Sequence, residues 1–363
     1  MTPSETFGRT ILRARKRSRE SFVVGLLIPV SGPLAMLGPS ALACGRLAGE
    51  AWNRAGGSLG REVRLAVLDA GAPSARLDDE VATLLDNDEL DAIVALGTTP
   101  VGHRVSEIIG ARVPMIFTTQ FEGTGLPRWV HAIGETPDRQ LLPAVQWMSE
   151  HRRVRRWYLL GNDYSWPRCA HRKVAERIRG LGGSVAAERY VALGERDFDR
   201  VVEEIAHSSA DAVLVSLIGS DSVHMCRAFA AADLPGRVLR LSSSIEENAL
   251  LGMGHRNTEG LFAVSGYFAT IGSEANARFK ERYHGRFGDR APTLNSLAQS
   301  VYEGLVHLRR QCGETTDNDD SPLSSVRSVR RPGPRSAPAE CVYLAEADGL
   351  ALRVIQDLSG PSR

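Results

Sequence analysis

Two aromatic residues in one short loop, Tyr164 and Trp166, are well suited to cover a small polar molecule. The loop, residues 161–168, follows an apolar run of strand length at 157–160 and leads into a helical pattern. Such a loop lies at the carboxyl edge of a parallel sheet, where open α/β sheets bind ligands. The alternative is that both rings are ordinary packing residues.

Hydroxyl and amide side chains stand directly after several other expected strands. Each of them alone is as compatible with capping a helix as with contacting a ligand. Their recurrence at the same edge of successive strands favours a binding site for a polar molecule. The runs are Gly97-Thr98-Thr99, Thr118-Thr119-Gln120 and Ser242-Ser243-Ser244.

Motifs for phosphate, dinucleotide or metal-hydrolase chemistry are absent from the sequence. The five cysteines lack metal-ligand spacing, so we expect neither a metal nor a cofactor, and free thiols in a reducing compartment are the simplest interpretation. Ser220 follows a strand where a nucleophile could stand, but the second glycine of a nucleophile elbow is missing. We therefore expect no enzyme, and Ser220 or Asp221 is predicted to cap a helix.

Strand-like and helix-like segments alternate from residue 22 onward, and the strands are apolar without alternation. This pattern predicts parallel sheets covered by helices on both faces. A chain of 363 residues exceeds one core, so we expect two doubly wound α/β lobes joined by hinge crossovers, with a cleft between them. The predicted units are a basic flexible arm (1–22), lobe 1 (23–137 plus 265–312), lobe 2 (138–264 plus 341–357, ending in a hairpin) and a flexible linker or crossover (313–340).

The basic arm and the apolar run after it, residues 22–30, together imitate a signal peptide. The run is short for a signal core and suits the first strand of the fold, so cleavage there would delete a central strand. We therefore expect a protein kept inside the cell. The net charge of +1 gives no field that would favour direct nucleic-acid binding, and no apolar run is long enough to span a membrane.

Several runs together resemble the type I periplasmic-binding-protein family, within it the branch of urea and short-chain-amide receptors and of the cytoplasmic amide sensor that regulates aliphatic amidase. They are Gly25-Leu26-Leu27 with Ser31-Gly32, Asn53 with Gly56-Gly57, Gln120-Phe121-Glu122-Gly123, Gly161-Asn162-Asp163-Tyr164 with Pro167-Arg168, Gly219, Ser244-Ile245-Glu246-Glu247 and Gly266-Tyr267-Phe268. The ligand-binding residues that the resemblance implies are Thr98, Thr99, Thr119, Gln120, Tyr164, Trp166, Gly219 and Ser243. Gly97 stands where an aromatic residue is usual, which leaves the size of the pocket open.

The resemblance implies a small neutral amide or urea as the ligand. Related amino-acid receptors place a carboxylate on lobe 2 for the ligand's ammonium group, where this chain has residues 242–244, all serine. Burying an amine without a counter-charge is costly, and only Glu246 is left as a carboxylate that could turn into the site. The expected role is an intracellular sensor with a regulatory protein partner. The alternative is an extracytoplasmic, membrane-associated receptor that feeds urea, short-chain amides or branched-chain amino acids to an ABC permease, and a homodimer is left open.

Overall fold

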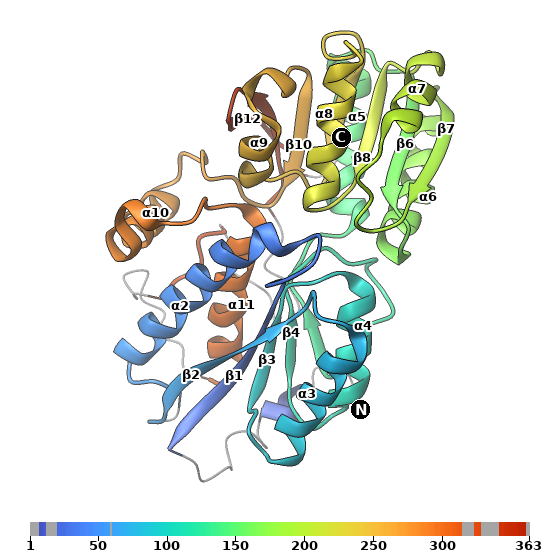
Figure 1. Cartoon of the computed structure of the whole chain (residues 1–363). Coiled ribbons are helices and arrows are strands. Elements are labelled where there is room, and N and C mark those ends of the chain that lie inside the picture. Colours follow the sequence, from blue (N-terminus) through green and yellow to red (C-terminus); the bar gives the residue numbers. More distant parts are fainter. Residues whose placement is uncertain (1–6, 12–19, 59, 314–322, 328–340, 361–363) are drawn as a thin grey trace.

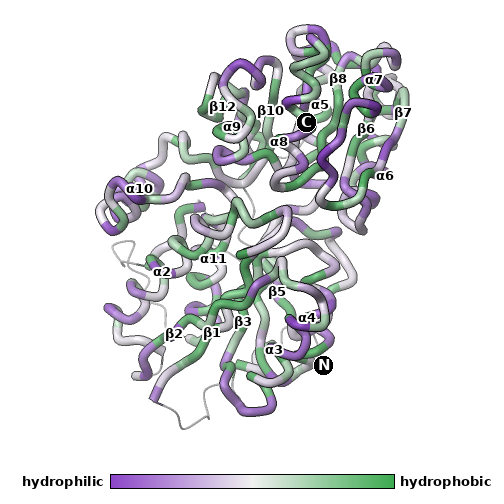
Figure 2. The backbone as a smooth tube through the Cα atoms, viewed as in Figure 1, coloured by the Kyte–Doolittle hydropathy of each residue, from purple (hydrophilic) through white to green (hydrophobic). Residues whose placement is uncertain are grey.

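The computed structural model contains two α/β lobes, each built on its own sheet (Figure 1). It describes residues 7–11, 20–58, 60–313, 323–327 and 341–360. Helices cover both faces of each sheet. The inner strands β1 (Ser21–Ile28), β3 (Ala92–Ala95), β4 (Met115–Phe117) and β8 (Ala212–Ser216) are apolar, whereas edge strands such as β7 (Ser184–Val191) carry hydrophilic residues (Figure 2). The predicted fold class of two lobes with parallel sheets is therefore confirmed.

The sheet of lobe 1 has the strand order β2-β1-β3-β4-β5, and all its pairs are parallel. Its strands are β1 Ser21–Ile28, β2 Glu62–Asp69, β3 Ala92–Ala95, β4 Met115–Phe117 and β5 Val130–Ala132. Along β1, Val24 and Leu26 pack on one face of the sheet and Leu27 packs on the other, as the two-residue period of a strand requires. The apolar run after the basic arm is thus a strand inside the sheet, between β2 and β3.

The helices of lobe 1 divide between the two faces of this sheet. They are α2 Gly38–Arg54, α3 Ser74–Asp86, α4 Thr99–Ile109, α10 Glu274–Phe287 and α11 Ser296–Gln311. Side chains of α2, α10 and α11 share one apolar cluster, and those of α3 and α4 share the cluster on the opposite face. The short helices η1 Ala35–Leu37 and η3 Gly288–Arg290 complete this lobe.

Lobe 2 has the strand order β12-β11-β10-β9-β8-β6-β7. Its strands are β6 Arg156–Asn162, β7 Ser184–Val191, β8 Ala212–Ser216, β9 Leu239–Ser242, β10 Leu261–Ser265, β11 Tyr343–Asp348 and β12 Ala351–Asp357. The pairs from β7 to β10 are parallel, whereas β10–β11 and β11–β12 are antiparallel. Its helices are α5 Pro137–His151, α6 Ser165–Gly180, α7 Asp199–His207, α8 Ser220–Ala231, α9 Glu247–Met253 and η2 His255–Asn257.

A buried ion pair joins the segments that cross between the lobes. Arg327 Nη1 lies 2.9 Å from Glu135 Oε1, and both side chains are almost fully buried. The Gly266 N–H donates to the same Glu135 oxygen at 2.9 Å. Glu135 belongs to the crossover before α5, Gly266 to the one after β10, and Arg327 to the one that leads to β11. All three crossovers are therefore fastened to one carboxylate.

Two stretches differ from the flexibility expected from their composition. Residues 323–327 of the predicted linker bury Leu323 and Val326 in the core of lobe 1, beside the paired Arg327. Residues 7–11 of the predicted arm are helical, with Phe7 and Ile11 buried in the same core. Isolated apolar residues in a basic or Ser-rich stretch gave no periodic signal. The remaining residues of the arm and linker lie outside the described part of the chain.

Candidate ligand site between the lobes

Thr98 and Thr99 lie where β3 meets α4, at the edge of lobe 1 that faces lobe 2. Thr98 is the N-cap residue of α4 and Thr99 is its first residue, with Pro100 favouring the helix start. The Thr99 side chain is buried, and its Oγ1 has no hydrogen-bond partner among the described residues. This hydroxyl is therefore available to a ligand.

The end of β4 lies beside the end of β3 and reaches lobe 2. The Gly97 N–H donates to Thr119 Oγ1 at 3.0 Å, which fixes the two strand ends together. Gln120 Nε2 donates to the Ser243 carbonyl oxygen in lobe 2 at 2.7 Å. The same carbonyl accepts from Gln140 Nε2 at 3.1 Å. Gln120 and Ser243, both predicted as ligand contacts, thus bind each other and form a buried link between the lobes.

The loop after β6 is held by a buried polar cluster. Asn162 Nδ2 and the Gly194 N–H each donate to Asp221 Oδ2 at 2.8 Å, and Asn162 Oδ1 accepts from the Ile218 N–H at 3.0 Å. Burial raises the pKa of Asp221. This cluster fixes the end of β6, so the position of Tyr164 at the start of α6 is defined by lobe 2.

Tyr164 is half-buried, and burial together with the nearby charges of Glu122 and Asp221 raises the pKa of its phenol. At neutral pH the ring is therefore uncharged and its hydroxyl can donate or accept a hydrogen bond. Helix α4 of lobe 1 approaches α6 of lobe 2, and Tyr164 stands at the start of α6, so Tyr164 lies near the junction between the lobes.

Trp166 is buried, and its ring belongs to the apolar cluster between α5 and α6 of lobe 2. Its Nε1 has no hydrogen-bond partner among the described residues. The indole is therefore a core residue that offers one N–H, which differs from the sequence-based expectation of a second ring covering the ligand.

Gly219 contacts lobe 1 directly. Its φ is +64°, and a Cβ at this position would lie 2.3 Å from the Pro33 carbonyl oxygen. The Ser220 N–H donates to that oxygen at 3.0 Å, and Asn248 Nδ2 donates to the Met36 carbonyl at 3.0 Å. The loop before α2 thus rests on lobe 2, and the two lobes are in contact on this side.

Ser220 does not cap α8 with its side chain. The N-cap residue of this helix is Gly219, and the Ser220 hydroxyl lies 3.3 Å from Asp221 Oδ1. The predicted capping role of Ser220 or Asp221 was therefore wrong, because Asp221 is engaged by the β6 loop.

Glu122 is the residue that the sequence-based site omitted. Both oxygens of its carboxylate are buried, and neither has a hydrogen-bond partner among the described residues. It lies in the loop that follows β4, next to Phe121, whose N–H donates to the Glu135 carbonyl at 3.1 Å. Gly123 then turns the chain with a φ of +92°. An acidic residue in the same loop as the polar run at 118–120 was the signal that could have identified it.

Glu246 and Glu247 are buried at the start of α9, and burial raises the pKa of both carboxyl groups. Glu246 Oε2 accepts from the Leu297 N–H at 3.2 Å, at the N-terminus of α11. Glu247 Oε1 accepts from the Ala269 N–H at 2.9 Å. Glu246, which the sequence left as a carboxylate able to turn into the site, is therefore engaged by lobe 1.

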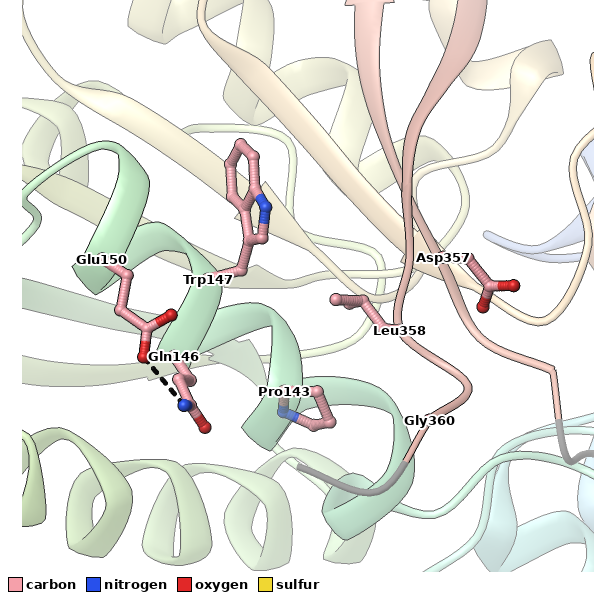
Figure 3. A pocket seen from close by; sticks show the side chains of 7 residues that line it. All are labelled: Pro143, Gln146, Trp147, Glu150, Asp357, Leu358 and Gly360. Carbon is pink, nitrogen blue, oxygen red and sulfur yellow. Dashed lines mark hydrogen bonds between the residues drawn. The ribbon is translucent and has the colours of Figure 1, made fainter. Parts of the chain in front are cut away.

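A separate shallow cavity of about 190 Å³ lies on the outer side of lobe 2 (Figure 3). Its walls come from α5, from the end of β12 and from the segment that follows β12, and none of the predicted site residues lies there. The residues that line the cavity are Pro143, Gln146, Trp147, Glu150, Asp357, Leu358 and Gly360. The described residues contain no cluster of metal-binding side chains, and none of the described helices is both long and apolar enough to cross a membrane. No disulfide bond joins any two of the five cysteines, all of which lie in the described part of the chain.

Two parallel-sheet lobes, three crossovers and polar groups facing each other at the junction define a two-lobe ligand-binding protein. The chain belongs to the periplasmic binding protein family, whose model matches residues 21–322. Assignment to the urea and amide branch goes beyond this match.

Solved structures with the same fold include an ABC transporter substrate-binding protein from Sphaerobacter thermophilus, at 20% identity and a TM-score of 0.74, covering 93% of this chain and 98% of that one. A solute-binding protein of an ABC transporter from R. palustris, in complex with 4-hydroxybenzoate, has 19% identity and a TM-score of 0.76, with 93% and 96% covered. A branched-chain amino acid transporter substrate-binding protein from Streptococcus pneumoniae, in complex with isoleucine, has 15% identity and a TM-score of 0.75, with 92% and 99% covered. At these identities the likeness concerns the fold.

Proposed function

We propose that this chain is a substrate-binding protein whose lobes close on a small polar molecule of the urea or short-chain-amide class. One observation carries the proposal: buried polar atoms of Thr99, Glu122 and Trp166, from both lobes, have no hydrogen-bond partner among the described residues. Buried polar groups in folded proteins are nearly always hydrogen-bonded, so such a set favours a ligand that completes it.

The chemistry of these atoms favours a molecule with both a carbonyl oxygen and N–H groups. The Trp166 indole can only donate, the Glu122 carboxylate accepts, and the Thr99 hydroxyl can do either. Urea or acetamide has four heavy atoms, and about 1.5 kcal/mol per atom limits binding to roughly 6 kcal/mol, or a dissociation constant of some tens of micromolar. Binding much tighter than this would indicate a larger ligand.

The role that we propose is delivery of this ligand to an ABC permease outside the cytoplasm. The solved structures similar in fold are described as substrate-binding proteins of such transporters. A ligand that contacts both lobes favours their closed arrangement, and a partner can recognise the surface that closure creates.

A second candidate is an intracellular sensor that passes the closed state to a regulatory protein. Its starting point is that β1, the apolar run that imitates a signal core, is an inner strand of the sheet of lobe 1 and so part of the folded chain. Cell fractionation with N-terminal sequencing separates the two roles. A processed protein outside the cytoplasm supports the receptor, and an unprocessed cytoplasmic protein supports the sensor.

A thermal-shift panel tests the ligand class, because only a ligand of the folded state raises the unfolding midpoint. The panel contains urea, formamide, acetamide, butyramide, leucine, isoleucine and 4-hydroxybenzoate. We expect urea or an amide to raise the midpoint. Stabilisation by isoleucine or 4-hydroxybenzoate with no response to any amide would overturn the proposed ligand class.

A further inference from the structure

Glu122 differs from the other buried carboxylates near the junction of the lobes. Glu135 is paired with Arg327, Asp221 accepts from Asn162 and Gly194, and Glu246 accepts from the N-terminus of α11. In Glu122 both oxygens are buried and neither is paired among the described residues. The residue as a whole is half-buried, but both carboxylate oxygens are shielded from solvent without donors, which favours donors that arrive with a ligand.

The local backbone fixes where this carboxylate stands. The Phe121 N–H is bound to the Glu135 carbonyl, and Gly123 turns the chain immediately afterwards. The preceding residue, Gln120, is hydrogen-bonded to Ser243 of lobe 2. The negative charge of Glu122 also acts on the Tyr164 phenol of lobe 2. Glu122 is therefore held near the junction by its neighbours on both sides in the chain.

We infer that the Glu122 carboxylate receives two parallel N–H groups of the ligand, one on each oxygen. The inference rests on the proposed function and, within its ligand class, favours a planar head in which one carbon carries two nitrogens, as in urea; guanidinium has the same pair of N–H groups but no carbonyl oxygen and serves as a probe of that geometry. Such a head presents two N–H groups side by side, and a carboxylate accepts them in the bidentate manner known for arginine. Acetamide has a single nitrogen and cannot form this pair.

With this assignment the charged group of the site comes from lobe 1, whereas in the related amino-acid receptors it comes from lobe 2. The sequence indicated a neutral site because lobe 2 carries serines where related receptors hold a carboxylate. Glu122 supplies a carboxylate from lobe 1, in the loop that follows β4. A site with this carboxylate accepts a neutral urea through hydrogen bonds and a guanidinium ion through hydrogen bonds and charge.

The test is isothermal titration calorimetry of the full chain with urea, guanidinium and acetamide as separate probes. Wild-type protein is expected to bind urea or guanidinium at least about tenfold more tightly than acetamide. Glu122→Gln, which replaces one acceptor oxygen by an NH₂ donor, is expected to lower the affinity for the preferred probe by at least about tenfold and the affinity for acetamide by less. Glu122→Asp keeps the charge but shortens the side chain, so its affinity for the preferred probe should lie between those of the wild type and Glu122→Gln.

Glu107→Gln is the matched control, since Glu107 is an exposed carboxylate on α4 in the same lobe. It should bind all three probes as the wild type does, and near-ultraviolet circular dichroism should show that every variant is folded. If the wild type binds acetamide as tightly as urea and guanidinium, or if Glu122→Gln leaves the preferred probe unaffected, the role of Glu122 is wrong while the proposed function stands. If the wild type binds none of the three probes and no amide of the thermal-shift panel raises the unfolding midpoint, both are wrong.

Discussion

Two buried polar regions lie between the lobes, and they differ in whether their groups are paired. At the crossovers, Arg327 donates to Glu135, to Gln299 Oε1 at 2.8 Å and to the Ser296 carbonyl at 3.1 Å. At the ends of β3 and β4, the Thr99 hydroxyl and the Glu122 carboxylate have no partner among the described residues. The difference separates a structural joint, which is complete in itself, from a site that needs another molecule.

The largest effect is expected from breaking the ion pair at the crossovers. Arg327→Ala leaves Glu135 buried without its counter-charge, which should lower the free energy of unfolding by about 3–5 kcal/mol. Urea denaturation at constant salt measures the loss. The control is Arg353→Ala, which removes the exposed pair with Asp348 and should cost about 0–1 kcal/mol. Equal losses in the two variants would show that the buried pair does not hold the crossovers.

The two threonines at the ligand-side edge provide a matched pair. Thr119→Val removes the acceptor of the buried Gly97 N–H and should lower the free energy of unfolding by about 1–3 kcal/mol. Thr99→Val removes a hydroxyl without a described partner and should change it by less than about 0.5 kcal/mol. Ligand affinity should fall in Thr99→Val, because this hydroxyl is proposed to contact the ligand. A stability loss in Thr99→Val as large as that in Thr119→Val would assign its hydroxyl a structural role.

Closure of the lobes is tested at Gly219. Gly219→Ala brings a Cβ against the Pro33 carbonyl of the other lobe, so the closed form should be disfavoured and ligand affinity should fall by about tenfold. Titration calorimetry measures the affinity, and small-angle scattering measures the compaction on binding. Gly254→Ala is the control, since its φ is +87° but no atom lies within 4 Å of the new Cβ. If Gly254→Ala lost affinity as well, the loss in Gly219→Ala would come from backbone strain at positive φ and not from a clash with the other lobe.

The smallest effect is expected in the ligand-free protein when Glu122 becomes glutamine. Removing an unpaired buried charge should raise the free energy of unfolding by about 1 kcal/mol, whereas Glu135→Gln, at a paired position, should lower it. Thermal and denaturant unfolding without ligand measure the sign of the change in the free energy of unfolding for both variants. If Glu122→Gln is destabilised as much as Glu135→Gln, its carboxylate has a partner and the contrast between the two regions disappears.

Much of the fold could be predicted because apolar strands and amphipathic helices carry local signals. The run that became β1 and the hairpin of β11 and β12 were recognisable from period and turn residues alone. By contrast, β5 has three half-buried residues and is defined by its pairing with β4. No local sequence pattern predicts such a strand. The buried Arg327 escaped prediction because its partner, Glu135, lies far away in the sequence.

The site was harder to predict than the fold, because residue type does not reveal which polar groups find partners. Thr99 and Thr119 look alike in the sequence, yet Thr119 accepts from Gly97 and the Thr99 hydroxyl is left unpaired among the described residues. Gln120 and Ser243 were predicted as ligand contacts, and the structure adds that the Gln120 amide donates to the Ser243 carbonyl. Glu122 was overlooked because the argument for a neutral ligand considered carboxylates of lobe 2 alone. These distinctions depend on contacts between distant segments.

A crystal structure of the protein with the strongest ligand of the thermal-shift panel tests most directly whether the unpaired groups of Thr99 and Glu122 form the ligand site. The expected result is a ligand between the lobes, with N–H groups about 2.7–3.2 Å from the Glu122 oxygens and an atom within hydrogen-bond distance of Thr99 Oγ1. A ligand that lies elsewhere, for example in the cavity beside Trp147, and leaves both side chains unpaired would contradict it.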